Sequence, residues 1–247
     1  MSRGAATLLR CFLSKQIYLE TFDQHRGGWW GWLGNDKGFN RLQWETGVVT
    51  ARSPWWIDYN HAPPGAGYLH MLFCLNTKGP FSDHHKDIAD DNRYVAAGCP
   101  LDFRNARITL RVRGELRERG AHMVLLLQGT ISGITAGWLL TGQPFAVTPE
   151  WNALTAVATQ DPKQWTCLRG RHDRLDYYNY HPLEAIVGNV NVNLMLVLFP
   201  LMVIPMGPLK SDPNVLRAGK DYPVWASALP EGYIELDTVK IDFADNT

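Results

Sequence analysis

The sequence predicts an all-β protein, an antiparallel β-sandwich of jelly-roll type with long loop insertions. Three observations predict it: short apolar segments, often with a period of two residues, Gly and Pro residues around those segments, and no convincing long amphipathic helical pattern. The 247 residues exceed an average domain, but all-β domains commonly reach this size as one unit. We expect an N-terminal extension or edge strand over residues 1–19 and a single sandwich domain over residues 20–247.

The first strands are predicted in the middle of the chain. Residues 106–113 alternate, which sends Ile108, Leu110 and Val112 to one face and the arginines to the other. Residues 123–128 form a continuous apolar run, which is typical of a central strand. Glycines and a proline then end the pattern.

Three further strands are predicted toward the C-terminus, over residues 154–159, 190–199 and 233–243. In the last of these the apolar residues leave period two near Asp237, which predicts a β-bulge there. Residues 194–206 are almost wholly apolar but are shorter than the roughly 20 residues of a membrane-spanning helix, and they contain prolines. This segment is therefore interpreted as a buried strand followed by a turn.

Two irregular stretches interrupt the strand pattern. Residues 53–100 are rich in Pro, Gly, His, Asp and aromatic residues and exceed the usual length of a connection, so they are expected to be functional. Residues 207–229 are rich in proline and are expected to run over the surface. No internal repeat or linker indicates a second domain.

Composition excludes several functions. The 24 basic and 24 acidic residues balance and form no like-charged run, so neither nucleic acid nor an anionic membrane is an expected partner. There is no P-loop, no GxGxxG in a βαβ setting and no GxSxG, so we expect no nucleotide cofactor and no serine-hydrolase chemistry. The four cysteines are widely spaced and are read as mostly buried thiols. The N-terminal apolar stretches are too short for a secretory signal, which favours a cytoplasmic protein, with a transit peptide as the alternative.

Three short motifs suggest a family. An acidic-Phe-acidic start at Glu20 to Asp23 leads to Gly28-Trp29, Thr148-Pro-Glu-Trp151 precedes a strand, and Asp237-Thr-Val-Lys-Ile lies in the last strand. Together they resemble the jelly-roll carbohydrate-binding modules of the galactose-binding-like superfamily, in which the first and last strands often share a structural Ca²⁺. The resemblance implies Glu20, Asp23 and Asp237 as the calcium ligands here. Their oxygen ligands suit calcium, but they can meet only if the two end strands pair.

The segment from Ser53 to His70 is the strongest candidate for a sugar site. It combines large rings and hydrogen-bonding side chains with a Pro-Pro-Gly turn that lowers the entropy of holding them in place. Sugar C–H faces stack on aromatic rings, while polar side chains bind the hydroxyls. The predicted ligand-binding residues are Trp55, Trp56, Asp58, Asn60, Tyr68 and Arg171. Alternatively, the two tryptophans pack in different layers and the polar residues cap turns; exposure of the rings distinguishes these cases.

Two polar clusters provide candidates for catalysis, residues 82–87 and 169–181. Imidazoles and carboxylates can bind metals or exchange protons, although adjacent histidines on a strand point to opposite faces. Alternatively, the first cluster is a solvated polar loop and the second is a loop held by salt bridges. If Asp58, His61, His85 and His172 converged on one cleft, catalysis by a His/Asp general base would become the better interpretation. The candidate catalytic residues are His61, His85, His172, Asp58 and Asp173.

The sequence thus favours recognition of a carbohydrate or glycoside-like small molecule by an aromatic-lined face, with Ca²⁺ as a structural ion. The first alternative is a lyase or hydrolase acting on a polyhydroxylated, sugar-like substrate. The second is an oligomeric structural protein whose exposed rings form a subunit interface.

Overall fold

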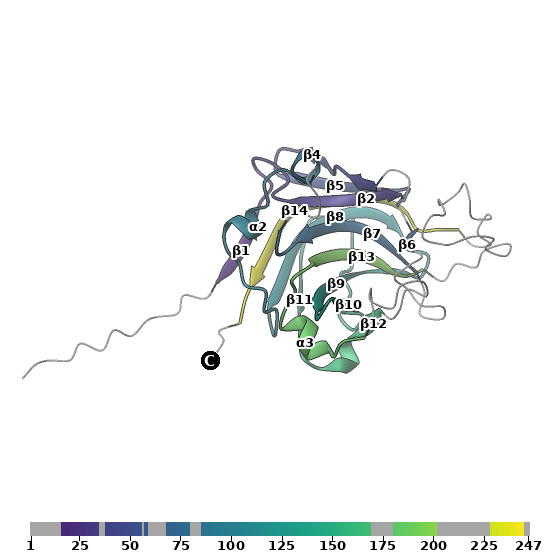
Figure 1. Cartoon of the computed structure of the whole chain (residues 1–247). Helices are drawn as coiled ribbons and strands as arrows, with labels where there is room; N and C mark the ends of the chain where they lie inside the picture. Colours follow the sequence, from purple (N-terminus) through teal and green to yellow (C-terminus); the bar gives the residue numbers. More distant parts are fainter. Residues whose placement is uncertain are drawn as a thin grey trace, which may run out of the picture.

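The described residues fold as two antiparallel β-sheets packed face to face, which confirms the predicted all-β sandwich (Figure 1). The computed structural model describes residues 16–34, 38–55, 57–58, 68–79, 85–168, 180–201 and 228–244. Within these ranges every strand pairing is antiparallel. The helices of this part of the chain are too short to cross a membrane.

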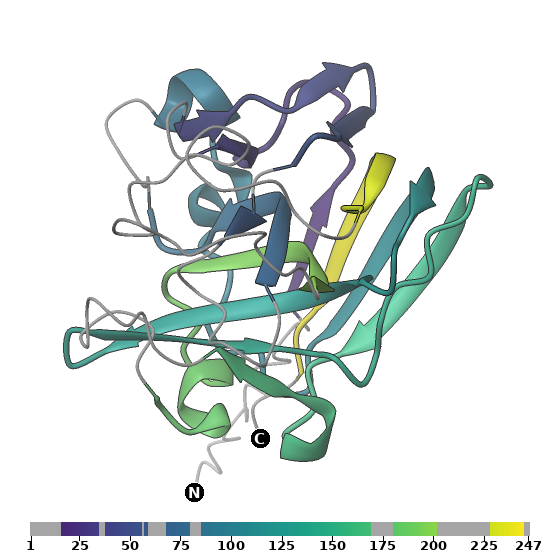
Figure 2. The same cartoon turned by 90° about the vertical axis from the view of Figure 1, so that its right-hand side faces the viewer.

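The described residues contribute six strands to sheet A. In spatial order they include β11, β8, β14, β5 and β4, while β1 also pairs with β14. Figure 2 shows β14 in yellow beside β8 in this layer. The strand bounds are β1 Ile17–Glu20, β4 Gln43–Glu45, β5 Val48–Arg52, β8 Arg107–Arg117, β11 Asn152–Val157 and β14 Glu231–Asp242.

Within the described ranges sheet B has eight strands, in the order β12, β10, β9, β13, β7, β2 and β3, with β6 also pairing with β7. Its bounds are β2 Trp29–Gly34, β3 Gly38–Asn40, β6 Ile57–Asp58, β7 Tyr68–Asn76, β9 His122–Ile131, β10 Ile134–Leu139, β12 Thr166–Leu168 and β13 Asn193–Leu201. The short helices are α1 His85–Ala89, α2 Arg93–Ala96 and α3 Leu183–Val187, and Pro162–Gln164 forms a 3-10 turn.

The five strands predicted from apolar patterns are present as β8, β9, β11, β13 and β14. The predicted bulge in β14 is also present, because the pairing with β8 shifts register between Leu236 and Thr238. β1 pairs with the second half of β14, with Glu20 opposite Val239. The first and last described strands are therefore neighbours, as a calcium shared between them would require.

The expectation that residues 53–100 are irregular is wrong for the middle of this range, which contains regular secondary structure. The nine-residue strand β7 runs through sheet B between β13 and β2, and α1 and α2 follow it. Every β7 residue after Tyr68 is buried, so both faces of the strand are covered and no period-two pattern marks it. Because Pro, Gly and His residues surround this short apolar run, the sequence pattern did not predict it as a strand.

Apolar side chains form two separate clusters. The inner core lies between the sheets and includes Phe73, Leu125 and Ile234. The second, here called the outer cluster, lies on the opposite face of sheet B, since strand neighbours of inner-core residues belong to it. It consists of Trp30, Leu69, Met71, Cys74, Ala89, Val124, Leu126, Leu139, Leu168, Met195, Val197 and Phe199. Both faces of β7, β9 and β13 are thus buried.

Candidate functional site

Three amide side chains form a row across the outer face of sheet B, in the middle of its strands. Asn193 on β13 lies opposite Asn76 on β7 and opposite Gln128 on β9. Alternation along each strand places these amides on the same face as the outer cluster. Their exposed fractions are 5% for Asn76, 4% for Asn193 and 1% for Gln128. This set is called the amide row below.

Hydrogen bonds are concentrated at one end of the amide row. The Trp30 indole N–H donates to Asn76 Oδ1 at 2.8 Å, and the Asn92 amide donates to the Asn76 backbone oxygen at 2.7 Å. Within the described part of the chain, Gln128 Oε1 and Asn193 Oδ1 are buried and accept no hydrogen bond. A buried acceptor without a donor costs about 1–3 kcal/mol, so these two oxygens mark a place where a donor is favoured.

A neighbouring amide, that of Asn191, forms hydrogen bonds through both its oxygen and its nitrogen. Asn191, two residues before Asn193, accepts from the backbone N–H of Thr130 at 2.7 Å and donates to the Thr130 backbone oxygen at 2.9 Å. This amide therefore ties the start of β13 to β9. Its two bonds are a structural role that Gln128 and Asn193 do not share.

Aromatic rings and a glycine bound the amide row. Trp30 and Trp32 lie two residues apart on the same face of β2, with their ring centres 5.7 Å apart and their planes tilted by 54°. At the other end Gly137 on β10 lies opposite Gln128. A Cβ at Gly137 would sit 3.3 Å from Gln128 Cγ, so glycine gives the Gln128 side chain its room.

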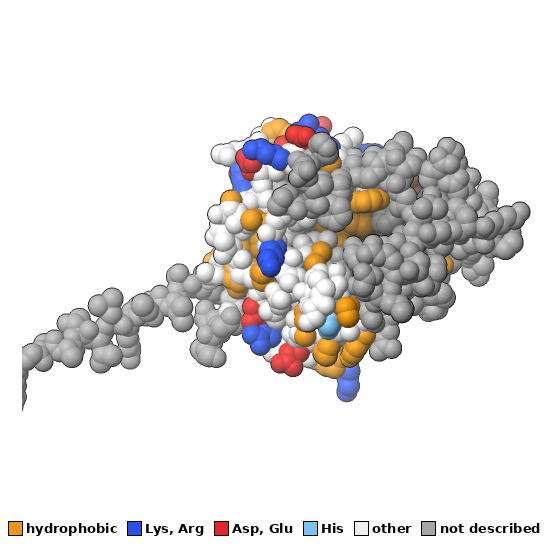
Figure 3. Space-filling view, in the orientation of Figure 1, with side chains coloured by type: hydrophobic (Ala, Val, Ile, Leu, Met, Phe, Trp, Pro, Cys, Tyr) orange, Lys and Arg blue, Asp and Glu red, His pale blue; other side chains and the backbone are white. Residues whose placement is uncertain are grey.

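The amide row carries no formal charge, and the described side chains that share its face of sheet B are mostly apolar. Cys74 lies beside Met195 in the outer cluster, and burial raises the pKa of its thiol well above the ordinary value. The thiol therefore stays neutral at physiological pH. In Figure 3, charged side chains gather around β4 at the top and α3 at the bottom, and mostly uncharged side chains lie between them.

The predicted ligand-binding residues are only partly described. Trp55 is 7% exposed and belongs to the inner core, with its ring 5.8 Å from that of His70. By the exposure criterion Trp55 is a packing residue, which corrects the expected platform role. Tyr68 begins β7 and packs half-buried against the inner core, and the Asp58 backbone pairs with Leu69. Trp56, Asn60 and Arg171 lie outside the described residues.

The predicted catalytic residues remain predictions. His61, His172 and Asp173 lie outside the described residues. His85 begins α1, a helix that lies near β2, and Asp58 lies in β6. The described backbone places these two residues on separate elements.

The three predicted calcium ligands do not form one site. Glu20 is fully buried, and its Oε1 accepts from the Phe22 backbone N–H at 2.9 Å and from Arg93 at 3.1 Å. Asp237 instead forms an ion pair with Arg111, and Asp23 accepts from the Thr21 hydroxyl. No group of three or more His, Cys, Asp or Glu side chains in the described ranges is arranged to hold a metal. The end strands pair as expected, but their carboxylates have other partners.

Sequence reasoning missed the amide row, although it contained a signal. Gln128 ends the apolar run of β9, and Asn193 begins that of β13. A polar amide inside a strand that is apolar on both faces requires a partner. Pairing the two positions required the register of β9 against β13, which the pattern of one strand does not contain.

Comparison with known proteins gives little further information. No protein-family model matches the sequence. No curated protein shows significant sequence similarity to it. One solved structure, reported under "Prominent members of the human gut microbiota express endo-acting O-glycanases to initiate mucin breakdown", aligns over 92% of this chain and 99% of its own at 12% identity, with a TM-score of 0.38. This similarity is too weak to transfer a ligand or a reaction.

Proposed function

We propose that the protein binds a neutral carbohydrate at the amide row on the outer face of sheet B. The observation that carries the proposal is the pair of buried oxygens, Gln128 Oε1 and Asn193 Oδ1, which accept no hydrogen bond within the described residues. Sugar hydroxyls donate to such oxygens and accept from the same amide groups. A polyol can therefore form hydrogen bonds with both the carbonyl oxygen and the NH2 group of each side chain.

The surroundings of the amide row favour a sugar over other hydrogen-bond donors. The rings of Trp30 and Trp32 lie next to it, and the aliphatic side chains of the outer cluster lie on the same face of the sheet. The C–H groups of a pyranose pack on such surfaces while its hydroxyls bind the amides. An ionic ligand would lose its hydration without meeting a counter-charge in the amide row, which favours a neutral sugar.

Binding is tested with a panel of neutral disaccharides: maltose, cellobiose, lactose and N-acetyllactosamine. Thermal shift selects the sugars that stabilise the protein, and calorimetric titration gives their affinity. We expect Gln128→Met or Asn193→Leu to weaken the selected sugar at least tenfold. Asn152→Leu, at an exposed amide that begins β11 in the other sheet, is the matched control and should retain affinity.

Two results would overturn the proposal. One is unchanged sugar affinity in a correctly folded Gln128→Met variant. The other is a panel in which no neutral sugar raises the melting temperature. Mass spectrometry of each bound sugar after incubation separates binding from the lyase or hydrolase alternative, because only an enzyme changes the mass of its ligand.

A further inference from the structure

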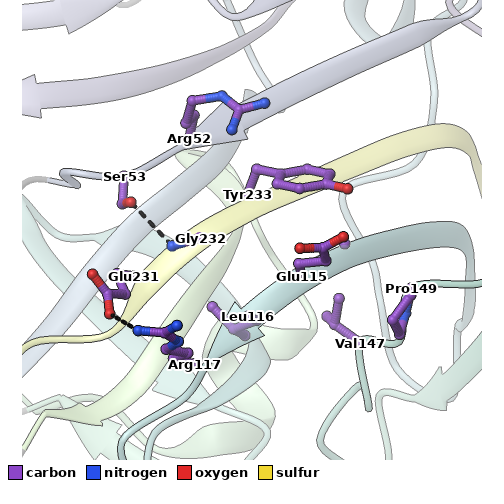
Figure 4. A pocket seen from close by; sticks show the side chains of 11 residues that line it. Arg52, Ser53, Glu115, Leu116, Arg117, Val147, Pro149, Glu231, Gly232 and Tyr233 are labelled. Atoms are coloured by element: carbon purple, nitrogen blue, oxygen red, sulfur yellow. Dashed lines mark hydrogen bonds and ion pairs between the residues drawn. The ribbon is translucent and has the colours of Figure 1, made fainter.

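A cavity lies in sheet A, apart from the amide row. Its volume is about 650 Å³, within the range of roughly 300–1,000 Å³ that small-molecule sites occupy. Side chains from β5, β8 and β14 line it, together with Val147 and Pro149 (Figure 4). Since the amide row lies in sheet B, the two sites are separate and their ligands can be tested independently.

The cavity is built on one cross-strand row. Tyr233 on β14 lies opposite Arg52 on β5 and, on its other side, opposite Glu115 on β8. Side chains in direct register lie on the same face of a sheet. The Arg52 guanidinium lies 4.7 Å from the centre of the Tyr233 ring, and Figure 4 shows the ring between Arg52 and Glu115.

This row interrupts a ladder of ion pairs. On one side of it Arg113 contacts Glu235 at 2.6 Å, and on the other Arg117 contacts Glu231 at 2.9 Å. Glu115, between the two arginines on the same strand, faces a tyrosine instead. In the described structure neither Glu115 nor Arg52 forms an ion pair, so the cavity holds a cation and an anion on either side of an aromatic ring.

The floor of the cavity is fixed by a glycine. Gly232 has φ +137°, and a Cβ there would lie 1.9 Å from the Glu115 backbone oxygen. The Gly232 N–H donates to Ser53 Oγ at 3.0 Å, and the Ser53 N–H donates to the Gly232 oxygen at 2.9 Å. These contacts hold β5, β14 and β8 together beneath the row, so its side chains project from a preorganised base.

The geometry points to an acidic sugar of the uronate type as the ligand of this cavity. The Arg52 guanidinium pairs with the carboxylate of the sugar, and the Glu115 carboxylate accepts hydrogen bonds from its hydroxyl groups. Their strands lie two spacings apart, about 10 Å between backbones. A sugar ring with a carboxylate on one side and hydroxyls on the other spans such a separation better than an amino acid, whose two charges lie on one carbon. Val147 and Pro149 provide an apolar wall for its C–H groups.

Galacturonate and glucuronate are the probes, and galactose and glucose are their matched neutral counterparts. We expect each uronate to bind at least tenfold more tightly than its neutral counterpart, with affinity that falls as salt rises. Arg52→Gln should remove this preference, and Glu115→Gln should weaken all four sugars. Arg111→Gln removes an arginine of the same face outside the cavity and should leave the preference intact.

Equal affinity for uronates and neutral sugars would overturn the inference, as would a preference that survives Arg52→Gln. Binding of glutamine with no binding of either uronate would also overturn it, because it would identify an amino-acid site. Gln128→Met separates this cavity from the amide row. It should weaken neutral-sugar binding at the amide row at least tenfold and leave the uronate preference unchanged.

Discussion

Gln128 on β9 and Asn193 on β13 face each other in register, and within the described residues the buried side-chain oxygen of neither accepts a hydrogen bond. The strands around them are otherwise apolar on both faces. Folding alone would favour apolar side chains at these positions. The proposed sugar site would explain two adjacent amides at these positions, because its ligand supplies the donors that their oxygens lack.

This explanation makes a prediction about stability. Gln128→Met keeps the volume and removes the unpaired oxygen, so the free energy of unfolding should stay the same or rise. Asn191→Leu removes two hydrogen bonds to the Thr130 backbone and should lower it by about 1–3 kcal/mol. Urea unfolding of both variants measures the contrast.

The contrast separates a ligand-binding amide from a structural one. Comparable destabilisation by Gln128→Met and Asn191→Leu would show that Gln128 supports the fold and would remove the basis for the sugar site. Equal m-values are required for the comparison, since a changed m-value reports a change in the unfolded or folded ensemble.

Trp30 and Asn76 provide a second test, because their hydrogen bond is buried and joins β2 to β7. Trp30→Phe leaves Asn76 Oδ1 without this donor, which should cost about 1–3 kcal/mol in addition to lost packing. A double-mutant cycle with Asn76→Leu isolates the bond, and we expect a coupling energy of about 1 kcal/mol. Additive effects of the two substitutions would mean that the bond contributes nothing measurable.

The sequence predicted the sandwich better than the site. Alternation in β8 and the apolar run of β9 follow from local rules, and so does the bulge near Asp237. The strand β7 was missed because His70 interrupts its apolar run and Pro, Gly and His residues precede that run. The packing role of Trp55 and the separation of Glu20 from Asp237 depend on which face each side chain meets, and that is decided by neighbouring strands rather than by local sequence.

Gly232 is predicted to be indispensable for the cavity of sheet A. Gly232→Ala places a Cβ at φ +137° and against the Glu115 backbone oxygen, so we expect a loss of about 3 kcal/mol or more. Gly133→Ala is the matched control, since Gly133 has φ +80° and a Cβ there would meet no atom within 4 Å. The control should lose only about 1–2 kcal/mol from backbone strain. Similar losses in both variants would show that the contact with Glu115 relaxes easily.

Glu20 predicts a pH dependence of stability that is unusual for a carboxylate in an ion pair. Burial raises its pKa above the ordinary value and outweighs the lowering effects of the Phe22 N–H and of Arg93. Between the unfolded pKa, about 4.3, and the raised folded pKa, the folded protein binds more protons than the unfolded chain. The contribution of Glu20 to stability is therefore fully present below the unfolded pKa and is lost as pH rises through the folded pKa.

The variant Glu20→Gln isolates this effect, because an amide of the same shape accepts the same backbone hydrogen bonds and does not titrate. We expect the free energy of unfolding of the wild type to fall relative to that of Glu20→Gln as pH rises from 4 to 7, as measured by urea unfolding at each pH. Glu45→Gln, at an exposed position on β4, controls for the loss of one carboxylate. If the wild type instead gained stability relative to Glu20→Gln over this range, the ion pair with Arg93 would outweigh burial, and Glu20 would be a stabilising anion.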